Sequence, residues 1–99
     1  MFGVEVLEYD LNNLAYLSKT LVIGYNWEAV KEKAQEIAKA AADKYRAYDY
    51  EIEAVNYGYI VYDGEDEPVV DISLGFLGAV DNEFIKSAKK CYNRVVKVR

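Results

Sequence analysis

The middle of the chain carries one apolar stripe at helical spacing, and this stripe limits the folds that the sequence can adopt. From Trp27 to about Tyr45, apolar residues recur at steps of three and four, opposite a charged face. Asn26 stands at the N-cap position, and Glu28 lies in the first turn, where an acid interacts favourably with the helix dipole. We therefore predict a helix over 27–45 whose buried, alanine-rich side packs closely on a sheet and consists of Val30, Ala34, Ile37, Ala38, Ala41 and Tyr45.

The segment before this helix has the pattern of a β-hairpin. Residues 3–9 alternate, with Val4 and Val6 on one side and Glu5 on the other. Residues 10–13 are rich in Asp and Asn, whose short side chains bond to the local backbone and favour turns. The run from about Tyr16 to Tyr25 is dense in β-branched residues, which favours a second strand.

Two further strands are predicted after the helix. A period-two pattern begins near Asp49 and continues through Val61, with Gly58 as a plausible bulge or bend near its middle. Residues 63–68 have turn composition. A fourth strand follows, with Val70, Ile72, Leu74 and Phe76 on one side.

The end of the chain predicts a second helix and leaves one alternative open. Asp81 is placed to cap a helix, and apolar residues then recur at helical spacing, at Phe84, Ile85, Ala88, Tyr92 and Val95. Residues 94–99 could instead form a short terminal strand. The whole chain, 1–99, is predicted to be a single α+β domain of order ββαββα, with an antiparallel four-stranded sheet and two helices packed on one face.

The residue content argues against most forms of catalysis. The chain has no histidine, which removes the commonest general base and transition-metal ligand, and a single cysteine, which excludes an internal disulfide. No glycine-rich phosphate loop or nucleophile motif is present. We therefore expect a protein that is not an enzyme and needs no cofactor or metal.

The hydrophobicity pattern predicts a protein that stays in the cytoplasm and has no contact with membranes. The apolar runs, such as 21–23, are far shorter than the roughly 18 residues of a membrane span. The first residues, Met1 to Glu5, do not have the pattern of a signal peptide.

Two other groups have the chemistry of a site but lack its spacing. The acids at 63–67, together with Asp71, could attract a cation, yet Gly64 does not stand where a calcium loop requires its glycine. We interpret this segment as a solvated hairpin tip. Cys91 has cationic neighbours that could lower a thiol pKa, but its place near the apolar stripe of the second helix favours a partly buried, inert side chain.

The ten tyrosines predict a surface that meets another protein. Tyrosine combines a large apolar ring with a polar tip, and it is enriched at interfaces. Tyr57, Tyr59 and Tyr62 lie close together in the third predicted strand, and Tyr57, Tyr59 and Val61 would form a row on one side of it. Because helices on one face leave the other face open, we predict an interaction module that forms a homodimer.

The alternative function is nucleic-acid binding through the basic end of the chain. The net charge is −5, yet residues 86–99 contain no acid and six cations. Such a segment can contact phosphates, although the acidic remainder of the chain would repel a polyanion. The candidate contacts are Lys86, Lys89, Lys90, Arg94, Lys97 and Arg99.

By its length, its many tyrosines, its single cysteine and its Lys/Glu/Ala-rich helix over 28–44, the chain resembles the small uncharacterised proteins of filamentous and rod-shaped viruses of thermophilic, acidophilic archaea. The resemblance covers the whole chain and carries no specific motif. It implies a thermostable viral protein in the cytoplasm of its host, of a kind that often acts by binding a host protein. It implies no particular site residues.

Overall fold

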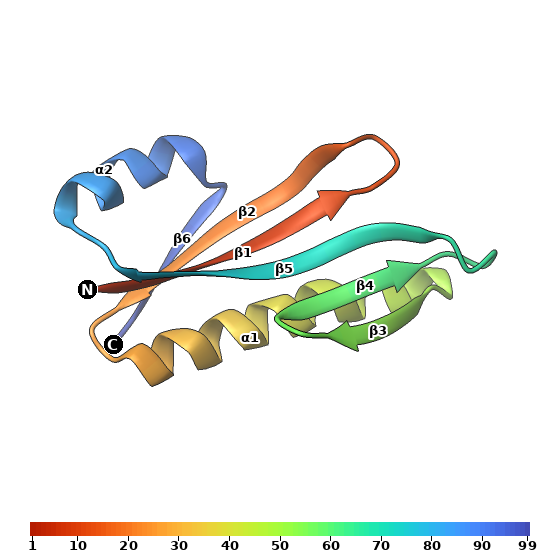
Figure 1. Cartoon of the computed structure of the whole chain (residues 1–99), viewed down its shortest axis with the longest axis horizontal. Helices are drawn as coiled ribbons and strands as arrows, with labels where there is room; N and C mark the ends of the chain where they lie inside the picture. The colour runs from red at the N-terminus through yellow and green to blue at the C-terminus, as the bar shows by residue number, and fades with distance from the viewer.

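The computed structural model describes all residues, 1–99, as two helices packed on a mixed six-stranded sheet (Figure 1). The chain forms β1 (Phe2–Asp10), β2 (Ala15–Gly24), α1 (Trp27–Asp43), a 3-10 segment η1 (Lys44–Tyr48), β3 (Glu51–Val55), β4 (Gly58–Tyr62), β5 (Pro68–Ala79), α2 (Asn82–Cys91) and β6 (Arg94–Val98). The prediction of an α+β fold is confirmed.

The β1–β2 hairpin forms as predicted, with the Asp/Asn segment as its turn. The Asp10 carboxylate accepts hydrogen bonds from the backbone N–H groups of Asn12 and Asn13 at 2.9 and 3.1 Å. It also accepts one from the Asn13 side chain at 2.8 Å. These bonds satisfy backbone N–H groups of the turn, which have no partner strand there, and so fix the conformation of the hairpin tip.

Helix α1 begins at the predicted cap and buries the predicted stripe with a small rotation. The Asn26 side chain accepts a hydrogen bond from the Ala29 N–H. The fully buried positions are Val30, Ala34, Ala38 and Ala42, whereas Ile37 and Ala41 are half-buried at the flank. The α-helix ends at Asp43, and the chain continues to Tyr48 as the 3-10 segment η1.

The third predicted strand is in fact a hairpin of two strands, β3 and β4. Its turn is at Asn56 and Tyr57, and Tyr57 has a left-handed backbone with φ of 62°. Gly58 then begins β4, where a β-carbon would lie 1.9 Å from the backbone oxygen of Ile72 on β5. Gly58 therefore allows β4 to approach β5 closely and does not act as a bulge within one longer strand.

The prediction of a four-stranded antiparallel sheet is wrong for two reasons. The split of the third strand adds one strand, and residues 94–98 leave helical geometry to form β6. The sheet order is β3-β4-β5-β1-β2-β6, in which β6 runs parallel to β2 and all other pairs are antiparallel. Helix α2 ends at Cys91, so Val95 belongs to β6 and not to the helix.

The two helices pack on opposite faces of the sheet (Figure 1). The prediction that both pack on one face is therefore wrong. Val22 belongs to the core under α1, whereas its neighbours Leu21 and Ile23 pack with Ala88 of α2. Successive residues of a strand point to opposite faces, so β2 is buried on both sides at this point. The prediction failed because it assumed that only one face of the sheet is apolar and that both helices pack on it.

Helix α2 covers only the end of its face near the chain termini, whereas α1 runs along much of the other face (Figure 1). The distal parts of β1 and β2 extend beyond α2 as a protruding hairpin. Neither helix is long and apolar enough to cross a membrane. On the α2 side of the sheet, the distal hairpin and the β3–β4 hairpin are therefore not covered by a helix.

Candidate interaction surface

The sheet has four free edge segments, and they differ in charge and in the exposure of apolar side chains. The outer side of β3 carries the exposed acids Glu51 and Glu53, and β6 carries the exposed cations Arg94 and Lys97. Charged side chains on an edge strand are a common protection against pairing with another chain. Two segments contain no charged residue: the end of β5 beyond its pairing with β4, residues 75–79, and Ala15–Ser18 of β2.

The outer side of Ala15–Ser18 is free because β6 pairs with only part of β2. Pairing between β2 and β6 begins at Thr20 with Arg94 and ends at Gly24 with Val98. Asn93 occupies the position beside Lys19, the residue before Thr20. Its side chain accepts a hydrogen bond from the Lys19 N–H at 2.7 Å, and its own N–H donates to the Lys19 carbonyl at 2.8 Å. The outer side of Ala15–Ser18 therefore has no strand partner.

Large apolar side chains are exposed on Ala15–Ser18 and at Leu14, directly before it. Leu14 is 72% exposed, Tyr16 is 51% exposed and Leu17 is 49% exposed. Leu17 lies at a register shift between β1 and β2, and Leu14 has a left-handed φ of 54°, which is unfavourable for leucine. An uncharged strand edge with exposed apolar residues is the usual signature of a surface that pairs with another strand.

A crevice of about 420 Å³ lies beside this edge on the α1 side of the sheet. Its wall includes Leu17, Tyr48 and the buried carboxylate of Glu8. Lys44 Nζ lies 3.1 Å from Glu8 Oε1, and the Tyr45 hydroxyl donates to Glu8 Oε2. Burial, together with this bond to Glu8, raises the pKa of the Tyr45 hydroxyl, so it remains a donor even in alkaline solution where an exposed tyrosine ionises.

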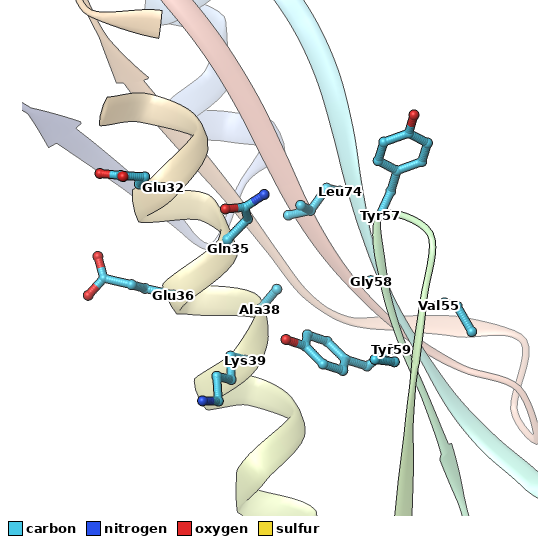
Figure 2. Close-up of a pocket in the computed structure, with 11 residues that line it drawn as sticks. Glu32, Gln35, Glu36, Ala38, Lys39, Val55, Tyr57, Gly58, Tyr59 and Leu74 are labelled. Carbon is cyan, nitrogen blue, oxygen red and sulfur yellow. The ribbon is translucent and has the colours of Figure 1, made fainter. Parts of the chain in front are cut away.

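The three tyrosines predicted as an interaction surface do not form one row. Figure 2 shows Tyr57 and Tyr59 at a groove of about 570 Å³ between α1 and the β3–β4 hairpin, with the Tyr59 hydroxyl pointing towards the helix. Val61 is fully buried beneath α1, so the expected row with Tyr57 and Tyr59 is not open. Tyr62 pairs with Glu51 on the opposite face of the sheet.

The groove in Figure 2 has an apolar floor and a charged outer rim. Ala38 and Leu74 line the floor, and the Gln35 amide points into the opening. Glu32 and Glu36 point away from the β3–β4 hairpin, so their carboxylates do not converge on a ligand in the groove. The arrangement can hold an apolar side chain but offers little specific recognition.

The six predicted nucleic-acid contacts lie on α2, on β6 and at the last residue. Arg94 pairs with Thr20 and so lies on the α1 side, whereas Lys97 pairs with Ile23 and lies on the α2 side. The structure therefore does not align these cations in a single row. Nucleic-acid binding through Lys86, Lys89, Lys90, Arg94, Lys97 and Arg99 stays a prediction.

The remaining chemical groups of the sequence have local structural roles. Asp63 accepts hydrogen bonds from the N–H groups of Glu65 and Glu67 and so organises the acidic tip between β4 and β5. No group of three or more Asp, Glu or Cys side chains is placed to hold a metal ion. Cys91 is exposed, so the expectation that it is partly buried is wrong. The next residue, Tyr92, points inward instead and donates a hydrogen bond to Glu5.

Comparison of the chain with models of protein families, with curated proteins and with solved structures finds no match in any of the three. The candidate site therefore rests on the geometry of the chain. Its main residues, Leu14, Tyr16 and Leu17, were not among the predicted contacts. The signal that could have found them is the uncharged run 14–18 beside the predicted turn, in a chain that is 29% charged.

Proposed function

We propose that the protein is a non-enzymatic interaction module that forms a homodimer by adding the free β2 edge of one copy to the same edge of another. The observation that carries the proposal is the contrast between the two uncharged edges. Leu14, Tyr16 and Leu17 are the more exposed, at 72%, 51% and 49%. On the end of β5, Phe76 and Leu77 are 40% and 37% exposed, and the Phe76 ring packs against the rings of Trp27 and Tyr57. Strand addition would pair the backbone groups of this segment and cover Leu14, Tyr16 and Leu17.

A second copy suits this edge because both sides of the contact would be the same uncharged segment. An isologous contact about a twofold axis brings like surfaces together, and this is unfavourable for a charged edge such as β3 but not for an apolar one. A host protein, the other partner that the resemblance to viral proteins implies, would use the same edge, because strand addition needs only an extended segment from the other chain.

The chemistry of the crevice supports binding over catalysis. Glu8 is the only carboxylate among the fully buried residues, and it is already compensated by Lys44 and Tyr45. A buried acid with both oxygens in use stabilises the packing of η1 on the sheet. We assign it a structural role beside the interaction surface.

Light scattering of the Leu17→Lys variant tests the proposal. The wild-type mass should rise with concentration from 11.3 kDa towards twice that value. A lysine at position 17 places a charge at the contact twice per dimer, so the dissociation constant should increase at least about tenfold. The matched control is Val55→Lys, which adds the same charge at another partly exposed apolar position, on the β3 edge.

Two outcomes would contradict the proposal. One is a wild-type protein that stays at 11.3 kDa up to about 1 mM, since a specific contact weaker than this has little biological use. The other is a Val55→Lys variant whose dimer is weakened as much as that of Leu17→Lys, which would place the contact elsewhere.

A further inference from the structure

The unpaired outer side of Ala15–Ser18 forms a gap beside β2, in line with β6. This gap is closed at one end, and the closed end restricts the orientation of an incoming strand. On the outer side of β2, β6 and Asn93 occupy the position next to Lys19 and all later residues. The other end, beyond Ala15, is open because the β1–β2 hairpin turns back there. A strand that fills the gap therefore lies in line with β6 and ends against Asn93 and Arg94.

We infer that the two copies pair in antiparallel orientation about a twofold axis perpendicular to the sheet, with the hairpin tip of each copy seated against the start of β6 in the other. This inference rests on the proposed function. In the antiparallel orientation the partner's segment 15–18 occupies the gap, and its turn, Asp10–Leu14, comes next along the same line, beside Arg94. A parallel pairing would not be twofold symmetric, because the slanted hydrogen bonds between parallel strands pair identical segments out of register.

The charges at the two ends of the gap are complementary in this arrangement. Asp10 pairs with Ala15 and has the same face as Glu8, which is the α1 side of the sheet. Arg94 pairs with Thr20 and lines a crevice on the α1 side with Val6 and Ile37. A twofold axis perpendicular to the sheet keeps the α1 sides of both copies together, so Asp10 of each copy faces Arg94 of the other.

The tip is organised to present a negative charge. The Asp10 carboxylate accepts hydrogen bonds from Asn13 and Asn12, and these bonds hold its pKa below the usual range. The group therefore stays ionised in mildly acidic solution. Arg94 is exposed and makes no ion pair within the chain. Each copy therefore contributes one free anion and one free cation to the contact.

Neutralising the two charges tests the arrangement. Asp10→Asn keeps a side-chain oxygen that can accept from the N–H groups of the tip, and Arg94→Gln leaves the parallel pairing of β6 intact. Each variant should raise the dimer dissociation constant about fivefold at low salt, because two exposed ion pairs are lost per dimer. The double variant should be no weaker than either single variant, since both remove the same pairs.

Sedimentation equilibrium at about 50 mM salt measures these constants, with Lys97→Gln as the control for loss of a cation from β6. A wild-type dimer that neither Asp10→Asn nor Arg94→Gln weakens would overturn the antiparallel arrangement while leaving edge pairing in place. A double variant weakened by the product of the single effects would also overturn it. A wild-type protein that does not dimerise would overturn the proposed function, and this inference with it.

Discussion

Replacing Gly58 with alanine is expected to destabilise the protein by about 3 kcal/mol or more. A β-carbon at this position would lie 1.9 Å from the Ile72 oxygen and 3.0 Å from Ser73 Cα, and both atoms belong to the backbone of β5. Because β5 is held on its other side by β1, it cannot move away without loss of further pairing. Urea denaturation should show a much lower midpoint for the variant.

Gly64→Ala is the matched control, because a β-carbon at Gly64 has no atom within 4 Å. This variant should change the free energy of unfolding by less than about 0.5 kcal/mol. Similar midpoints for Gly58→Ala and Gly64→Ala would mean that β4 and β5 do not approach closely at Gly58. The division of residues 51–62 into β3 and β4 would then have to be revised.

Leu21→Ala should cost about 2 to 5 kcal/mol, the usual range for a buried leucine. Leu21 is fully buried between the sheet and α2, in a small core with Ile23 and Ala88. Loss of its side chain would leave a cavity that so small a core cannot easily fill. The measurement is the free energy of unfolding at one fixed protein concentration, because the proposed dimer would also contribute to stability.

This variant also tests the placement of the helices. Leu77, on β5, is 37% exposed, and Leu77→Ala should cost less than half as much as Leu21→Ala. If both helices packed on the α1 face, Leu21 would point to solvent and its replacement would have little effect. Equal stabilities for the two variants would therefore contradict the two-sided arrangement.

Local sequence patterns predicted the elements well where a single physical signal was sufficient. The caps at Asn26 and Asp81 and the turn at Asp10 act through hydrogen bonds to residues two or three positions away. Such contacts are visible in sequence. The β3–β4 turn was missed because Tyr57 adopts a left-handed backbone that tyrosine rarely favours, and the reason for Gly58 lies on β5, fourteen residues away.

The arrangement of the elements depended on contacts that the sequence does not display. The run Leu21–Ile23 is apolar on both faces, which is typical of a strand covered from two sides. That signal was available, but it does not say which helix covers which face. The parallel position of β6 beside β2 depends on the Asn93 bridge to Lys19, a contact across 74 positions of the sequence.

The candidate site lies on other residues than the tyrosines that the sequence favoured. Tyrosine content indicated an interaction surface, yet Tyr59 faces α1 and Tyr57 and Tyr62 lie on different parts of the β3–β4 hairpin. The free edge at Ala15–Ser18 exists because β6 begins only at Arg94, beside Thr20. Its exposure is a property of the whole sheet, so periodicity within β2 could not reveal it.

Amide hydrogen exchange as a function of protein concentration tests edge pairing most directly. Within Ala15–Ser18, the outward-facing amides should exchange at least about tenfold more slowly at concentrations where the dimer predominates than in dilute solution. Amides on the outer edge of β3 should exchange at the same rate in both, because that edge stays free. If the mass doubles while exchange at Ala15–Ser18 does not change with concentration, the dimer uses another surface and the central claim is wrong.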